Sequence, residues 1–181
     1  MSSGGTREAL VQAGVDLLEE TGSTEIGLRE IARRAGVSHG APRRWFPTHK
    51  ALLGAIAEVG LRDLAQTLAD TGGDTSDITG WARAYIEFAW ARPAMFSLIF
   101  RHDLLEGSGA GLRSVSTPLF DRLVGRVRTT RADADPLTTA TALWVGVHGI
   151  AVLSTTGALG LAAPEVDIDE LICRVLRDTL G

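Results

Sequence analysis

The chain of 181 residues has a single cysteine, Cys173, so no disulfide can form within it. A lone thiol cannot by itself supply a zinc site, and a lone histidine such as His148 is not a convincing metal ligand. We therefore predict neither a disulfide framework nor a metal site, and we expect no cofactor. The side chain of Cys173 is expected to pack as a small hydrophobic group on a helix.

Long apolar runs are also missing. The longest, Leu143–Leu153, has 11 residues and contains His148, whereas a membrane-spanning helix needs about 20 apolar residues. The first residues, MSSGGTREALVQ, lack the basic start and apolar run of a secretory signal. These two absences predict a cytoplasmic protein with no segment across a membrane.

The motifs that mark common enzyme classes are absent as well. The sequence has no nucleophile elbow, phosphate-binding glycine loop, paired-histidine motif or combination of cysteine and histidine. The dipeptide of His102 and Asp103 stands alone at the expected end of a helix, where a capping contact explains it better than catalysis. We therefore predict that the chain is not an enzyme.

The pattern that is present favours helices. Apolar residues recur at spacings of three and four rather than two, and runs of β-branched residues are absent, which predicts an all-α chain. With 45% hydrophobic and 22% charged residues, we expect it to form a packed globular protein. The pattern predicts about nine helices: one capped by Thr6 and ending at Gly22, one over Leu28–Ala35, a short one capped by Ser38 and ended by Pro47, one capped by Thr48 and running to about Thr71, and five more at about 78–91, 94–101, 112–130, 137–159 and 168–180.

The charges are unevenly distributed along the chain. The formal net charge of −4 alone argues against nucleic-acid binding, but residues 29–50 hold six basic side chains against the single acid Glu30. Residues 51–181 hold 11 basic and 16 acidic side chains. A short basic segment on an acidic body is the asymmetry expected of a small nucleic-acid-binding module.

The basic segment contains a helix-turn-helix pattern, LREIARRAGVSHGAPRRWF, from Leu28 to Phe46. A helix with an apolar inner side precedes a turn at Gly36, and a short helix bearing Arg43 and Arg44 follows. In such a motif the second helix is held out from the body, so its N-terminal end can enter the major groove of DNA. The alternative is an αα-hairpin within a bundle that has a solvated arginine face.

Residues 7–53 resemble the tetracycline-repressor (TetR) family of bacterial transcription regulators in order and spacing. The shared segments are ALVQAGVDLLEETG, LREIARRAGVSHGAP, and FP followed two residues later by a helix with KALL. Farther along, YIEFAWARPAMFSLIF and LWVGVHGIAVL resemble a subgroup with a Trp-x-x-x-His-Gly signature. The resemblance implies a DNA-binding domain over residues 1–47, and an effector-binding and dimerisation domain over 48–181, joined by a long helix.

The resemblance also implies which residues contact DNA, with two departures from the family pattern. Arg43 stands where the family usually has a tyrosine, and Trp45 stands at the aromatic or histidine position two residues later. His49 precedes Lys50 where the family usually has lysine before glutamate. Arg44 is the better candidate for a bidentate contact to guanine, although a phosphate contact remains the alternative. The expected DNA-binding residues are Ser38, His39, Gly40, Arg43, Arg44, His49 and Lys50.

Aromatic residues are concentrated in the second half. Trp81, Tyr85 and Phe88 recur at i, i+4 and i+7, and Trp144 precedes His148 by four residues, so each group shares one helical face. Such a stripe is core in many bundles; the alternative is an apolar pocket with a few polar groups. We expect a small apolar or aromatic effector to contact Trp81, Tyr85, Phe88, Phe96, Phe100, Trp144 and His148.

Together these patterns predict a ligand-responsive homodimeric transcriptional regulator. We expect a repressor that leaves a palindromic double-stranded DNA operator when its effector binds. The helices at about 137–159 and 168–180 are expected to form the dimer interface, because they combine apolar residues with many small ones. The alternative is a dimeric ligand-binding or protein-partner module of the same fold that has lost specific operator binding through the altered Arg43, Trp45 and His49.

Overall fold

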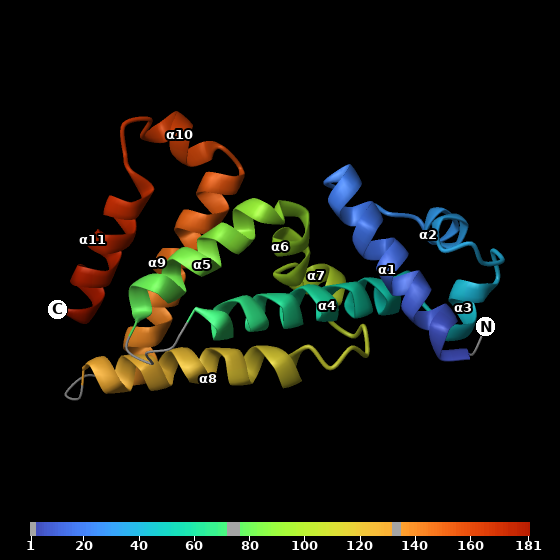
Figure 1. Cartoon of the computed structure of the whole chain (residues 1–181), viewed down its shortest axis with the longest axis horizontal. Helices are drawn as coiled ribbons and strands as arrows, with labels where there is room; N and C mark the ends of the chain where they lie inside the picture. The colour runs from blue at the N-terminus through green and yellow to red at the C-terminus, as the bar shows by residue number, and fades with distance from the viewer. Residues whose placement is uncertain (1–2, 72–76, 132–134) are drawn as a thin grey trace. The chain divides into compact units, whose positions relative to one another are not determined.

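The computed structural model describes residues 3–71, 77–131 and 135–181, and the regular secondary structure within them is helical throughout. The predicted all-α class is therefore confirmed. The described residues contain eleven helices, shown in Figure 1. They divide into two compact units: residues 1–62 with 92–113, and residues 63–91 with 114–181.

The first unit is built around the first long helix. This helix, α1, packs against α2, α3 and α6. Its Leu10 and Leu18, together with Ile31 on α2 and Leu52 and Ile56 on α4, have no exposed surface. Each helix therefore turns one apolar face inward, as the spacing of its apolar residues predicts. The helices of this unit are α1 (Ser3–Thr21), α2 (Leu28–Arg34), α3 (Ala41–Trp45), the first part of α4 (His49–Asp70), α6 (Pro93–Ile99) and α7 (His102–Leu105).

The second unit has α5 at its centre. This helix packs against α9 and α11, and eight of its 14 residues are buried. Ala82 and Ala89 are fully buried, and their small side chains permit close approach of the neighbouring helices. The helices of this unit are the end of α4, α5 (Ile78–Ala91), α8 (Arg113–Thr130), α9 (Pro136–Thr155), α10 (Ala158–Ala162) and α11 (Ile168–Leu180).

Two short helices account for the difference between nine expected helices and eleven described ones. The segment between the helices predicted at about 94–101 and 112–130 contains α7. The helix predicted at 137–159 was too long, since α9 ends at Thr155 and α10 begins at Ala158. Between them Gly157 has φ of 75°, a left-handed conformation that glycine adopts without steric cost and that interrupts the helix.

Of three predicted helix caps, one is correct. Thr48 accepts a hydrogen bond at its hydroxyl from the Ala51 backbone N–H, 3.0 Å away, and so caps α4. Thr6 is not a cap, because α1 already begins at Ser3. Ser38 is not the cap of α3, because that position belongs to Gly40 and has no side-chain hydrogen bond.

The helix α9 bears on the prediction that no segment crosses a membrane. It has 20 residues and a mean hydropathy of 1.5 over its most apolar window, so by length and composition alone it is able to span a bilayer. A core helix of a globular protein passes the same test, and α9 packs against α5, α10 and α11. Only 28% of that window is buried, however, so much of its apolar surface still lacks a partner within the described chain.

Candidate functional site

The turn between α2 and α3 gives the helix-turn-helix its shape. Gly36 has φ of 66°, a conformation that favours glycine and reverses the chain. The Val37 backbone N–H then donates to the carbonyl of Ala32, 3.0 Å away, which closes the end of α2. Because Ala32 is buried and Val37 is half-buried, the turn is fixed to the core of its unit.

The third helix turns one face inward and the other to solvent. Pro42 and Phe46 are buried. Arg43 and Arg44 are exposed between them. Trp45 lies between the two buried residues, and 36% of its surface is exposed. In a five-residue helix the inner face has room for Pro42 and Phe46, so the indole in between remains at the surface.

Three of the predicted DNA-binding residues lie at the start of this exposed face. Ser38, His39 and Gly40 are all exposed in the turn that leads into α3. Ser38 and Gly40 line a hollow of about 730 Å³ together with Arg44 and Trp45. Five of the predicted DNA-binding residues are therefore exposed in this turn and on α3: Ser38, His39, Gly40, Arg43 and Arg44.

The start of α1 adds residues that sequence reasoning missed. Thr6 lines the same hollow as Arg44. The guanidinium of Arg7 lies over the Phe46 ring, 5.4 Å from its centroid, in cation–π geometry. Arg7 is exposed, so it adds a positive charge next to α3. Its position in the sequence, 36 residues before Arg43, gave no sign of this proximity.

Two of the arginines in the basic segment are paired with acids. Arg33 binds Glu30 one turn earlier on α2, and Arg34 binds Glu20 on α1. These hydrogen bonds lower the pKa of both carboxyl groups below their usual range. Among the described residues, Arg29, Arg43, Arg44 and Lys50 have no acidic partner, so these four side chains carry the unbalanced positive charge of the segment.

His49 and Lys50 lie at the start of α4, outside the exposed surface on α3. The His49 Nε2 atom lies 2.6 Å from the carbonyl oxygen of Ile26 and donates a hydrogen bond to it. This contact ties α4 to the segment before α2, and it occupies one of the two ring nitrogens. Lys50 is half-buried.

In the second unit, four of the predicted effector residues meet around one hydroxyl group. The Tyr85 hydroxyl lies 2.9 Å from Nδ1 of His148, and it accepts a hydrogen bond from the Trp144 indole N–H at 3.3 Å. The Trp81 ring stacks on Tyr85 with 5.5 Å between ring centroids. The α5 and α9 stripes predicted from spacing therefore do pack together, and Tyr85 connects them.

Burial determines the protonation states within this network. It raises the pKa of the Tyr85 hydroxyl and lowers the pKa of His148. Burial therefore favours the neutral form of both groups. A neutral imidazole pairs with the Tyr85 hydroxyl through Nδ1, as acceptor or as donor according to which ring nitrogen carries the proton.

Of the other three predicted effector residues, one belongs to the second unit and two belong to the first. Phe88 is buried on α5. Phe96 and Phe100 belong to the first unit, where their rings meet edge to face with centroids 5.0 Å apart. The structure thus gathers Trp81, Tyr85, Trp144 and His148, and it places Phe96 and Phe100 in the other compact unit.

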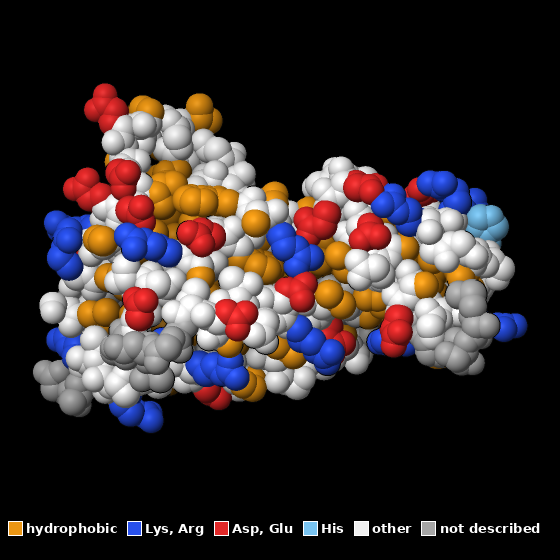
Figure 2. Space-filling view, viewed as in Figure 1, with side chains coloured by type: hydrophobic (Ala, Val, Ile, Leu, Met, Phe, Trp, Pro, Cys, Tyr) orange, Lys and Arg blue, Asp and Glu red, His pale blue; other side chains and the backbone are white. Residues whose placement is uncertain are grey.

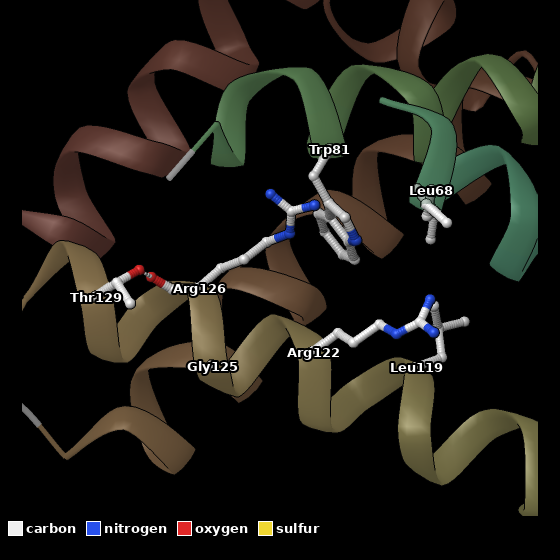
Figure 3. A pocket seen from close by; sticks show the side chains of 8 residues that line it. Leu68, Trp81, Leu119, Arg122, Gly125, Arg126 and Thr129 are labelled. Atoms are coloured by element: carbon white, nitrogen blue, oxygen red, sulfur yellow. Dashed lines mark hydrogen bonds between the residues drawn. The ribbon is translucent and has the colours of Figure 1, made fainter. Parts of the chain in front are cut away.

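A pocket of about 520 Å³ lies next to the aromatic network (Figure 3). Its walls come from the end of α4, from α5 and from α8. Trp81 is the one predicted effector residue that lines it. Arg122 and Arg126 of α8 also line it, and sequence reasoning missed both because charged residues on an amphipathic helix normally indicate only a solvated face.

Exposed apolar residues gather on α9 and α10. Figure 2 shows hydrophobic side chains at the surface over α9, below α10. On α9 the side chains of Val145 and Leu153 are 58% and 46% exposed, and on α10 that of Leu161 is 88% exposed. Contiguous apolar surface of this kind marks an interface in many proteins.

Comparisons with known proteins agree with this fold. Residues 78–179 match the family model of the tetracyclin repressor-like C-terminal domain. A solved protein of unknown function from Rhodococcus sp. RHA1 is 26% identical, with a TM-score of 0.79 over 97% of this chain and 93% of that one. No curated protein matches the chain.

Two further solved structures are similar in fold and contain small ring compounds. The multidrug binding protein EbrR, complexed with imidazole, is 21% identical, with a TM-score of 0.68 over 97% of this chain and 89% of that one. RolR, in complex with its ligand resorcinol, is 18% identical, with a TM-score of 0.66 over 96% of this chain and 86% of that one.

Proposed function

Because the chain belongs to the TetR family, whose members are non-enzymatic transcriptional regulators that respond to ligands, we propose that it is a homodimeric repressor. It binds a palindromic operator in the absence of its effector and leaves the operator when the effector binds. Residues 1–47 form the DNA-binding domain, and residues 48–181 form the domain for the effector and the second subunit. This function is carried out in the cytoplasm.

The observation that carries this proposal is the exposed surface on α3. Ser38, His39 and Gly40 at the turn, and Arg43 and Arg44 on the helix, are all solvent-exposed on a short helix whose other face is buried. The size and exposure suit entry into a major groove about 12 Å wide. We propose that Arg44 reads a base edge, that Arg43 and Lys50 contact phosphates, and that His49 orients the start of α4.

The aromatic residues support an effector with an apolar or aromatic ring. Trp81 and Tyr85 offer stacked faces on α5, and Trp144 and His148 add polar edges from α9. EbrR with imidazole and RolR with resorcinol show that proteins of this fold accept small rings. We propose the full set of Trp81, Tyr85, Phe88, Phe96, Phe100, Trp144 and His148 as residues that sense the effector, by direct contact or through packing.

The dimer interface is proposed on α9 and α11. These helices pack against each other, so they present a common outer surface. Val145 and Leu153 on α9 expose apolar side chains that no described element covers. A second copy of the chain would cover them by twofold symmetry, the commonest arrangement of soluble oligomers.

The regulatory step follows from coupled equilibria. The helix α4 contributes residues to both compact units, since it runs from His49 to Asp70 and the units divide at residue 62. An effector that prefers one position of α4 shifts the dimer toward that state. It weakens operator binding by the difference between its affinities for the two states.

One observation favours the alternative function, a module that has lost operator specificity. One ring nitrogen of His49 is hydrogen-bonded to the Ile26 carbonyl, so this nitrogen is not available to DNA. Trp45 is exposed on the face that would approach DNA. A bulky indole at this position would obstruct the groove unless it contacts a base or sugar.

A mobility-shift assay with the DNA that flanks the chain's own gene separates the two functions. We expect a shift that resists excess unrelated DNA and is reduced when Arg44 is replaced by alanine. Equal binding to all fragments, or none at low salt, would support the alternative.

A further inference from the structure

The pocket beside Trp81 has two arginines on one wall. Arg122 and Arg126 are four residues apart on α8, so they lie on the same face of that helix, one turn apart. Figure 3 shows both side chains extending from α8 into the space between α8 and the helices that bear Trp81 and Leu68. The lining residues include no acid.

Apart from Thr129, the rest of the lining is apolar or small. Leu68 from α4 and Leu119 from α8 supply aliphatic surface, and the Trp81 indole from α5 supplies an aromatic one. Gly125 lies on α8 between the two arginines, and a Cβ atom there would meet open space. The pocket therefore combines an apolar floor with two positive charges and room at the helix backbone.

This combination is chemically selective. Two guanidinium groups one helical turn apart repel each other, and an anion placed between them relieves the repulsion while accepting charge-assisted hydrogen bonds. A carboxylate fits a guanidinium by two parallel hydrogen bonds. A flat apolar body attached to the carboxylate would lie against Trp81 and the two leucines.

We propose that this pocket binds an aromatic carboxylate, with the carboxylate between Arg122 and Arg126 and the ring against Trp81. The proposal rests on the proposed function as a ligand-responsive regulator and specifies the class of effector. The sequence predicted an apolar or aromatic effector, and the pocket adds the requirement that this effector carries a negative charge. The volume of about 520 Å³ suits one small organic molecule.

Calorimetric titration of the full-length protein tests the proposal directly. The probes are benzoate, salicylate, 1-naphthoate and 2-naphthoate, each compared with the neutral alcohol in which a CH₂OH group replaces the carboxylate. We expect at least one acid to bind at least about tenfold more tightly than its alcohol, because a charge-assisted hydrogen bond is much stronger than a neutral one. Equal affinity of acid and alcohol, or no binding of any acid at millimolar concentration, would overturn the proposal.

Three variants and one control locate the site. Arg122→Gln and Arg126→Gln should each weaken binding of the acid at least about tenfold. Gly125→Leu should abolish it by filling the pocket, and because leucine is a better helix former than glycine, α8 should be preserved. Arg128→Gln is the matched control, since Arg128 is exposed on the same helix and does not line the pocket. An equal loss in Arg128→Gln, or none in the three variants, would refute this location.

A mobility-shift assay on the same proteins separates this proposal from the proposed function. The acid should release DNA from the unmodified protein and not from Gly125→Leu. If the acid binds with the expected variant pattern but never affects DNA binding, the anion site stands and ligand-responsive repression fails. If DNA is released by neutral rings alone, repression stands and the anion site fails.

Discussion

Arg34 and Arg44 have the same charge but different surroundings. Arg34 is held by Glu20 through two hydrogen bonds, one of them 2.6 Å long, whereas Arg44 is exposed on α3 and has no acidic partner among the described residues. An arginine that is already paired must lose its partner before it can bind a phosphate or a base. Arg44 has no ion pair to break before it binds DNA. We therefore expect Arg44 to contribute more to DNA binding than Arg34.

Replacing Arg44 with alanine should weaken operator binding by about 1–3 kcal/mol and relax the base preference at one position in each half-site. Fluorescence anisotropy on the operator and on single-base variants measures both effects. Arg62→Ala is a suitable control, because Arg62 pairs with Glu58 on α4, away from α3. A loss that is equal on every sequence would assign Arg44 to a phosphate, and an unchanged affinity would remove it from the interface.

His148 should make folding stability depend on pH. Burial lowers its pKa in the folded state below the usual value of about 6.5, so folding favours the neutral imidazole that is hydrogen-bonded to Tyr85. The stabilisation is present above about pH 6.5 and is lost as the pH falls toward the lowered folded-state pKa. Urea unfolding between pH 7.5 and 5 should show this loss, and His148→Asn should remove that part of the pH dependence. A variant whose stability falls with pH as steeply as the unmodified chain would contradict the prediction.

Single-residue features were predictable where the local sequence determines them. Spacing placed Trp144 and His148 on one helical face, but the hydroxyl that joins them to α5 comes from Tyr85, 59 residues before Trp144 in the chain. The spacing of apolar residues along the sequence does not indicate contacts between residues this far apart. Arg122 and Arg126 were missed for a related reason, because whether a charged helix face meets solvent or a pocket depends on the helices opposite it.

At the scale of helices, the ends of the helices are set more often by glycines with positive φ than by side-chain caps. Gly36 ends α2 as expected, because its φ of 66° suits a residue without Cβ. The early end of α9 has the same cause at Gly157, but the apolar pattern continued past it and masked the break. Ser38 failed as a cap because α3 starts three residues later, a shift that one exposed turn allows.

Thr48 is a side-chain cap that the sequence did identify, and its removal should be measurable. Thr48→Ala deletes the hydroxyl that accepts from the Ala51 N–H, and it should lower the free energy of unfolding by about 1 kcal/mol. Chemical denaturation is the measurement. Thr67→Ala, in the interior of the same helix, is the control and should be neutral or slightly stabilising, since alanine favours helix interiors. Equal effects of the two substitutions would argue against a capping role.

The outer face of α9 should control assembly. Val145 is 58% exposed, so arginine at this position costs little within one subunit, but it places a charge in the proposed interface. Val145→Arg should convert a dimer to a monomer in sedimentation velocity at micromolar concentration. The control Gln66→Arg adds the same charge at an exposed position of α4 and should remain dimeric. Monomers in the unmodified chain at that concentration would contradict the interface and, with it, the palindromic operator.

At the scale of the whole molecule, DNA binding must overcome a net charge of −4. Unpaired cations are concentrated in the basic segment, while Glu20 on α1 and Glu30 within the segment neutralise two of its arginines. The sequence showed the segment but overstated its charge, because counting residues does not show which arginines are paired. The four that have no acidic partner among the described residues are Arg29, Arg43, Arg44 and Lys50.

This count predicts the salt dependence of operator binding. If each of these four cations neutralises one phosphate, a dimer releases the counterions of eight phosphates. A plot of the logarithm of affinity against the logarithm of salt concentration should then have a slope of about −7. A monomer would give about half that slope. Anisotropy titrations between about 50 and 200 mM salt measure it, the range over which such contacts change affinity strongly.

The paired acids provide the decisive variant. Replacing Glu20 and Glu30 with glutamine frees Arg34 and Arg33, and if these reach phosphates the slope should become steeper by up to about 4 in a dimer. The matched control replaces Glu58 with glutamine and Asp178 with asparagine, which changes the net charge equally but frees Arg62 and Arg174 far along the chain from α3. Because a general charge effect would act on both proteins alike, a steeper slope in the first alone places the DNA along α2 and α3. Identical slopes in the two proteins would mean that the DNA lies beyond the reach of α2, and that the unpaired cations of α3 and α4 alone set the electrostatic affinity.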